Sequence, residues 1–205
     1  MSIFLCIRGV WLYLCDMQRI IVKDKNGKTR TVTVPSYHHD IAWDSGGGGG
    51  LNYLTGSIAT IYTTPDLNFA LTETDMNNFI LSGSLSGSFA VNSLNGFTLS
   101  KNYYVAVIEG YFNIASSGTY YFSLDSDDAS DLYVNNNYIA HWYGGHGSIG
   151  AGGHDVTGSI SLNAGYIPFK ARLQQRTGGD GLTVYYRTNP SDSWVVVPNS
   201  WLSRI

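Results

Sequence analysis

The sequence predicts an all-β protein in which a β-hairpin arm precedes a β-sandwich or β-barrel. Tyr, Val, Ile, Thr, Ser, Gly and Asn are common while Lys, Glu and Ala are scarce, which is the composition of strands and turns. Short strand-like segments recur at roughly ten-residue spacing after residue 51, and no long amphipathic helix stands out. The 205 residues suit one globular domain with an arm.

The predicted arm covers residues 1–35. Residues 3–15 are mostly apolar, and we expect them to form one packed strand or a segment buried against a partner chain. They fall short of the roughly 20 apolar residues that a membrane span needs. Residues 18–34 are predicted to form a hairpin, because two β-branched segments flank the turn signal Asn26-Gly27.

Residues 36–50 form a predicted linker, and residues 51–205 form the predicted β-sandwich domain. The linker ends in five consecutive glycines, which cannot hold a packed conformation at low entropic cost. Residues 72–78 fit at most one short helical turn. Strands are expected over residues 57–63, 79–90, 103–114, 118–125, 130–135, 137–143, 156–162, 166–175, 181–188 and 193–198.

Charge divides the arm from the domain. Residues 1–30 carry six basic and two acidic side chains, whereas residues 31–205 carry six basic and thirteen acidic ones. The net charge of −3 argues against a nucleic-acid partner bound through its phosphates. An acidic domain whose acids are nearly all aspartate is better suited to binding cations. Both cysteines, Cys6 and Cys15, lie in the arm, so the domain is not a disulfide scaffold.

The densest acidic cluster is Asp125-Ser-Asp-Asp-Ala-Ser-Asp131, between two predicted strands. Its carboxylates repel one another, and a calcium ion with oxygen ligands would resolve the repulsion. The alternative is a turn in which the aspartates bond their own backbone. Adjacent side chains of an extended trans chain point to opposite faces, so Asp127 and Asp128 would grip one ion only across a cis peptide bond.

Residues 110–135 resemble the central motif of PA14 domains. The shared features are a Ser-Gly-Thr-Tyr turn, a Tyr-Phe-Ser-Leu strand, the Ser-Asp-Asp triplet and a Leu-Tyr-Val strand. Residues 162–173 and 178–186 are similar to a later strand and to the glycine-rich loop of the same family. The resemblance extends over residues 51–205 and is strongest at 103–188.

This resemblance implies a two-sheet β-sandwich and, in the family's lectin members, a calcium ion held by a cis-linked Asp-Asp pair. By position, Asp127 and Asp128 are that pair, and the ion would coordinate two neighbouring sugar hydroxyls. The second calcium loop of the family falls on residues 175–181, where the lectins use an asparagine. This chain offers Gln175 or Arg176 there and Asp180 further on, so we expect Gln175 and Asp180 to complete the metal ligands. Other members bind no sugar and serve structural or processing roles.

The predicted sugar-binding residues are the two aspartates together with Trp142, Tyr143 and Arg176. Trp142 and Tyr143 lie in a glycine-rich segment, and aromatic faces stack on the C–H surfaces of sugars. The alternative for Trp142 is an inward strand position that fills the core. Three histidines in the same segment lack the spacing of a recurrent zinc site.

The sequence predicts no enzyme. A glycosidase needs two carboxylates across a cleft, and Glu109 has no evident partner. There is no Gly-x-Ser-x-Gly elbow or phosphate-binding loop, and both cysteines lie outside the domain.

Two functions follow as expectations. The first is a calcium-dependent module that binds surface glycans and is displayed extracellularly, on a cell or virion surface. The second is a structural or decoration protein of an extracellular or viral assembly, without sugar binding. In that case residues 1–35 would anchor it to neighbouring subunits through exposed strand edges.

Overall fold

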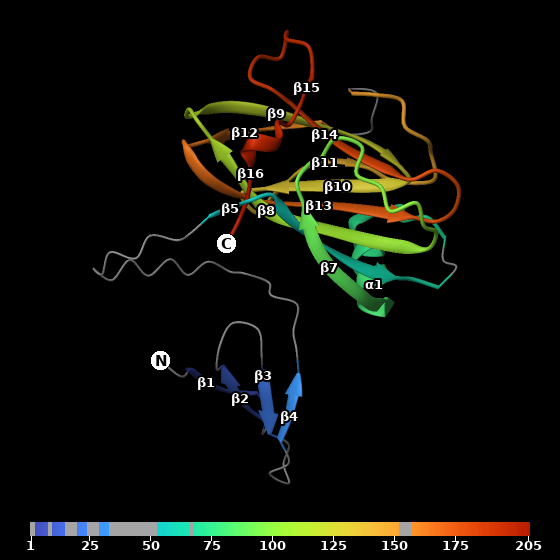
Figure 1. The fold of residues 1–205 in the computed structure, drawn as a ribbon, viewed down its shortest axis with the longest axis vertical. Helices are drawn as coiled ribbons and strands as arrows, with labels where there is room; N and C mark the ends of the chain where they lie inside the picture. The colour runs from blue at the N-terminus through green and yellow to red at the C-terminus, as the bar shows by residue number, and fades with distance from the viewer. Residues whose placement is uncertain are drawn as a thin grey trace, which may run out of the picture. The chain divides into compact units, whose positions relative to one another are not determined.

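The computed structural model describes residues 3–7, 10–14, 20–23, 29–32, 53–65, 68–151 and 157–205. The chain divides into two compact units, Met1–Gly49 and Gly50–Ile205 (Figure 1). The predicted linker at 36–50 lies outside the described residues.

The N-terminal unit is a four-stranded antiparallel sheet in the order β1-β2-β3-β4. Its strands are β1 (Ile3–Ile7), β2 (Val10–Leu14), β3 (Ile20–Lys23) and β4 (Thr29–Val32). β3 and β4 pair as the predicted hairpin requires, with Ile20 opposite Val32. The expected single strand at 3–15 is instead two antiparallel strands, with Ile3 opposite Leu14. The apolar run is divided by Arg8-Gly9, which breaks it into two strand-length pieces.

The C-terminal unit contains two antiparallel sheets, as expected for a β-sandwich (Figure 1). The larger sheet has the order β11 (Asn137–Trp142), β10 (Ala129–Val134), β13 (Gly165–Gln175), β8 (Tyr104–Ile114), β16 (Leu202–Arg204) and β5 (Leu54–Thr55). β6 (Ser57–Thr63) also pairs with β8, and β7 (Ser84–Val91) pairs with β6. The smaller sheet has the order β12 (Gly158–Leu162), β9 (Gly118–Asp127), β14 (Gly181–Arg187) and β15 (Val195–Val196).

Three phenylalanines mark the centre of the core between the sheets. Alternate residues of a strand face opposite sides of its sheet, so the inward set of each sheet meets the other. The Phe112 ring stacks on Phe169 at 4.1 Å between centroids and lies 5.9 Å from the ring of Phe122. Trp201 lies in the short 3-10 helix η1 (Asn199–Trp201), and the centre of its ring is 6.1 Å from that of Phe112.

One helix departs from the sequence prediction. α1 (Glu73–Ser82) occupies the start of the expected strand 79–90, which begins only at β7. Thr72 caps the helix by accepting a hydrogen bond from the backbone N–H of Asp75. Met76 is fully buried, and Phe79 and Ile80 pack on the same cluster, so tertiary burial at helical spacing overrides a weak local preference. Over the described ranges, no helix has the length and apolar character to span a membrane.

Candidate functional site

The acidic cluster lies where the chain passes from the smaller sheet to the larger one. Asp127 ends β9 opposite Gly181 of β14, while Ala129 begins β10 opposite Gln174 of β13. These registers bring the predicted second loop, residues 175–181, beside Asp127 and Asp128. The peptide bond between the two aspartates is cis.

Both aspartates of the pair are poorly hydrated. Asp128 is 4% exposed, and its Oδ2 accepts a hydrogen bond from the backbone N–H of Arg176 at 3.0 Å. Asp127 is half-buried, and a Cβ added to Gly179 would come within 2.8 Å of its Oδ2. Burial raises the pKa of Asp127 above its ordinary value, and the nearby His146 partly counters this. Burial likewise raises the pKa of Asp128, against the hydrogen bond from Arg176.

Gln175 adds an unsatisfied oxygen to the site. The side chain is fully buried at the end of β13, and its Nε2 donates to the carbonyl of Gly179 at 2.6 Å. Its Oε1 is buried and has no hydrogen-bond partner within the described part of the chain. A buried acceptor without a donor is costly, and an amide oxygen is a ligand that calcium accepts. The residues present therefore fit a calcium ion.

Asp180 lies in the same loop but has other partners. Its carboxylate accepts from the Thr98 hydroxyl at 2.5 Å, the Tyr104 hydroxyl at 2.6 Å and the backbone N–H of Leu99 at 2.7 Å. Burial alone would raise its pKa, but these hydrogen bonds outweigh burial, and the pKa lies below the ordinary value. Within the ranges that the structure describes, no three His, Cys, Asp or Glu side chains gather closely enough to hold a metal ion. A cation at the pair would therefore draw its other ligands from amide or carbonyl oxygens.

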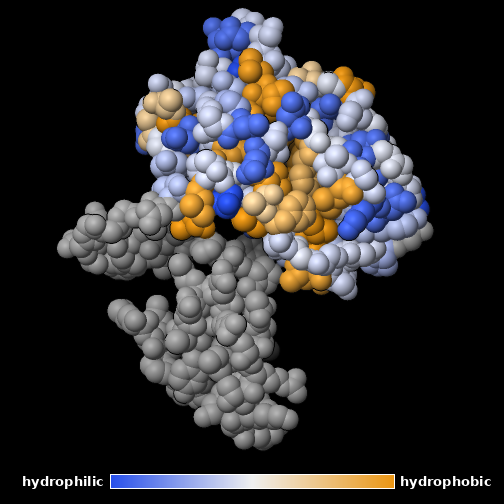
Figure 2. Space-filling model, viewed as in Figure 1, coloured by the Kyte–Doolittle hydropathy of each residue, from blue (hydrophilic) through white to orange (hydrophobic). Residues whose placement is uncertain are grey.

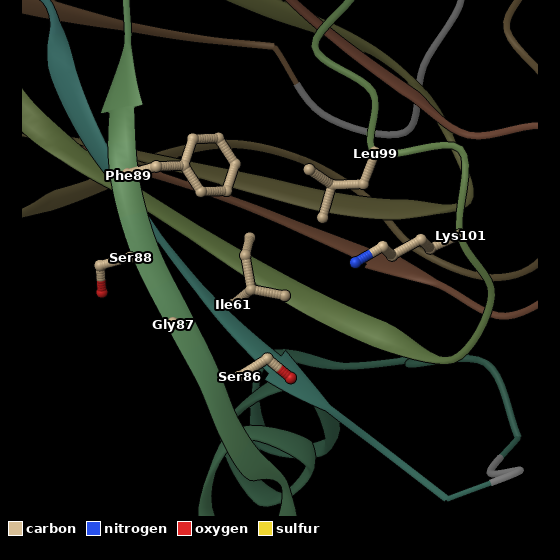
Figure 3. A pocket seen from close by; sticks show the side chains of 7 residues that line it. All are labelled: Ile61, Ser86, Gly87, Ser88, Phe89, Leu99 and Lys101. Atoms are coloured by element: carbon tan, nitrogen blue, oxygen red, sulfur yellow. The ribbon is translucent and has the colours of Figure 1, made fainter.

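Residues 98–100, which are hydrogen-bonded to Asp180, border a hollow of about 220 Å³ beside β6 and β7 (Figure 3). Its apolar walls are the side chains of Ile61, Phe89 and Leu99, and the Lys101 amine points toward it. Leu85 and Phe89 of β7 are exposed, and apolar surface gathers over this strand in Figure 2. None of the predicted site residues lines the hollow.

Trp142 and Tyr143 leave β11 toward the aspartate pair. The half-buried Trp142 ring stacks on His146 at 3.3 Å between centroids and 9° between planes. His146 Nδ1 in turn lies 3.2 Å from the carbonyl oxygen of Ser126, next to Asp127. The Tyr143 hydroxyl donates to Asp131 Oδ2 at 2.7 Å and accepts from the Tyr138 hydroxyl at 3.0 Å.

Asp131 forms a buried ion pair that sequence reasoning missed. Its two oxygens accept from Arg172 Nε at 2.7 Å and Nη2 at 2.5 Å, and both side chains are nearly inaccessible. Arg172 Nη1 also donates to Asn77 Oδ1 of α1 at 2.5 Å. The signal in the sequence was an arginine between the apolar residues Ala171 and Leu173, but its partner is set by the pairing of β10 with β13, which places Asp131 opposite Arg172.

One family model and several solved structures match this chain. The model of the PA14 domain family matches residues 80–194. Among solved structures, the PA14 domain of the MpAFP antifreeze protein superposes with a TM-score of 0.59 at 16% identity, covering 78% of this chain and 96% of that chain. A PA14 sugar-binding domain from an RTX adhesin gives 0.58 at 14% identity, with coverages of 74% and 99%. The Epithelial Adhesin 6 A domain from Candida glabrata, in complex with Galβ1-3GlcNAc, gives 0.54 at 13% identity, with coverages of 76% and 89%. No curated protein matches the sequence.

Proposed function

This chain belongs to the PA14 domain family, and on that premise we propose that it is a calcium-dependent carbohydrate-binding module. The observation that carries the proposal is the buried, unpartnered Oε1 of Gln175 beside two carboxylates whose pKa values are raised by burial. The similar RTX adhesin domain binds sugar, and the similar Candida glabrata adhesin domain is in complex with Galβ1-3GlcNAc, which supports the same function.

In this proposal, Asp127, Asp128 and Gln175 hold the ion through side-chain oxygens. When bound, calcium supplies open coordination positions that two adjacent sugar hydroxyls can fill. The backbone N–H of Arg176 fixes Asp128, and the amide of Gln175 is fixed by the carbonyl of Gly179. Asp180 is placed among the ligands by the sequence. In this proposal it instead steadies the loop 176–180, because it accepts hydrogen bonds from Thr98 and Leu99.

The rim would orient the sugar without changing it. The Trp142 ring is held in place by stacking on His146, and it offers an aromatic surface to sugar C–H groups. The Arg176 guanidinium lies 5.3 Å from the centre of the Phe69 ring and can donate to sugar oxygens. Binding without turnover makes this a recognition module, not an enzyme. One site that holds a sugar through two hydroxyls binds weakly, so display in many copies on a cell or virion surface suits it.

A glycan array probed with the full chain in millimolar calcium and again in EDTA tests the proposal. We expect glycan binding in calcium and its loss in EDTA, with calorimetry detecting calcium alone. Asp128→Asn should abolish both signals. Asp192→Asn, which alters an exposed aspartate of the β14–β15 turn, should leave both unchanged. Equal glycan binding in EDTA, together with no heat from calcium, would remove the proposal.

A second candidate function, docking in an assembly, is favoured by the separate N-terminal sheet β1–β4. We propose that residues 1–35 contact neighbouring subunits. Sedimentation of the full chain and of a chain lacking residues 1–35 tests this. An oligomer that dissociates on deletion supports docking. The same number of chains per particle before and after deletion rejects it.

A further inference from the structure

We propose that Phe69 and Ala70 are positioning residues that set the distance between the two loops flanking the Asp127–Asp128 pair. The inference rests on the proposed function, because it concerns the same calcium site. The first loop is residues 143–149, after β11, and the second is residues 176–180, after β13. Sequence reasoning gave Phe69 no role.

The first loop lies directly against Phe69 and Ala70. The backbone N–H of Gly144 donates to the carbonyl of Ala70 at 2.8 Å. The Phe69 ring fills the space that a Cβ on Gly145 would need, since three ring atoms would lie 2.5 to 2.8 Å from that carbon. Residue 145 must therefore be glycine for the ring to keep its place.

The second loop also contacts Phe69 and Ala70. The guanidinium carbon of Arg176 lies 5.3 Å from the centre of the Phe69 ring, within the range of a cation–π interaction. The backbone N–H of Ala70 donates to Oε1 of the buried Gln174 at 3.1 Å, one residue before Gln175. The Phe69 ring thus lies close to both Gly145 and Arg176.

The same two loops meet again at Asp128. Its carboxylate accepts a hydrogen bond from the backbone N–H of Arg176 at 3.0 Å, and the backbone N–H of His146, in the first loop, lies near the same carboxylate. Phe69 and Ala70 therefore contact both loops, and both loops in turn reach Asp128. Moving the ring therefore shifts both N–H groups beside Asp128, and it shifts Gln175 with them.

The first test removes the ring and measures binding of calcium chloride alone to the full chain. We expect Phe69→Ala to weaken calcium binding about tenfold, which corresponds to about 1.4 kcal/mol. Phe69→Leu should recover part of the loss because it restores apolar volume. The control is Phe89→Ala, a half-exposed phenylalanine of the hollow on β7, which should bind calcium as the wild type does. Wild-type affinity in Phe69→Ala would overturn the inference.

A second variant displaces the ring without removing it. Gly145→Ala adds one methyl group where the ring lies, and we expect a loss of calcium affinity comparable to that of Phe69→Ala. Gly118→Ala is the matched control, because its added carbon would meet nothing within 4 Å. Equal affinities in the two alanine variants would contradict the proposed role.

Amide hydrogen exchange without calcium separates this inference from the proposed function. Phe69→Ala should speed exchange at the N–H groups of Gly144 and Arg176, while Phe89→Ala should not. If the wild type binds no calcium, the proposed function fails and exchange alone decides the positioning role. If both amides exchange at wild-type rates in Phe69→Ala, the positioning role fails whether or not calcium binds.

Discussion

The two ends of one acidic segment have opposite electrostatic surroundings. Asp131 is fully buried and meets a guanidinium through both of its oxygens, with a tyrosine hydroxyl as a further donor. Asp127 and Asp128 lie four and three residues earlier; Asp128 accepts from the backbone N–H of Arg176, and burial raises the pKa of both aspartates. The difference arises because the pairing of β10 with β13 places Asp131 opposite Arg172, while the other two aspartates lie where the chain passes between the sheets. Closeness in sequence therefore does not make these carboxylates one site.

The largest expected effect comes from breaking the satisfied end. Arg172→Met should lower the free energy of unfolding by about 3–5 kcal/mol, because it leaves Asp131 buried without a counter-charge. Urea unfolding measures this, with Lys101→Met on the exposed loop as the control for loss of a cation. A loss no larger than that of the control would mean that the pair contributes little.

Calcium should act on the other end alone. At a calcium concentration 100-fold above the dissociation constant, the unfolding free energy of the wild type should rise by about 2.7 kcal/mol. Asp128→Asn should lose this increment, because one ligand is gone. Arg172→Met should keep it if the two ends are independent, so an equal loss in both variants would show that they are coupled.

Asp180 provides an intermediate case, since its acceptor oxygens are satisfied by neutral donors. Asp180→Asn should cost about 2 kcal/mol at neutral pH, the scale of hydrogen bonds to a charged group. Its folded pKa lies below the ordinary value of 3.8, so its contribution is present above 3.8 and is lost as the pH falls through the folded pKa. Urea unfolding of both proteins at several pH values should show the two stabilities converging in acid. A constant gap would contradict an ionised role.

The smallest expected effect has the opposite sign. The folded pKa of Asp128 lies above its ordinary value of 3.8, so in calcium-free protein its ionisation destabilises the fold as the pH rises through the folded pKa. Asp128→Asn should therefore be more stable than the wild type at pH 7 in EDTA, by about 1 kcal/mol. Below pH 3.8 the two should match. A less stable variant in EDTA would place an unrecognised cation or donor at this carboxylate.

The strands were predictable because their signals are local. β8, β9 and β13 are rich in aromatic and β-branched residues, and the turns between strands are marked by Gly, Asn and Ser. The helix α1 was not, because Met76, Phe79 and Ile80 favour a helix only when the outer face of the larger sheet is there to bury them. Pattern reasoning over so short a segment cannot separate that spacing from a strand.

The candidate site was predictable in part. Asp127 and Asp128 stand out as neighbouring acids at the end of a strand, and the resemblance to PA14 domains pointed to Gln175. The place of Phe69 beside two loops depends on contacts between segments more than thirty residues apart, and the unpartnered oxygen of Gln175 depends on the packing around it. Such contacts leave no periodic mark in the chain.

The passage from β9 to β10 has a mechanical consequence. Strand β9 pairs with β14 as far as Asp127, and strand β10 pairs with β13 from Ala129 onward. The two aspartates therefore lie at the junction between the two sheets. A pulling force on a ligand bound at these aspartates would therefore act on both sheets at once. It could not separate one strand pair without loading the other sheet.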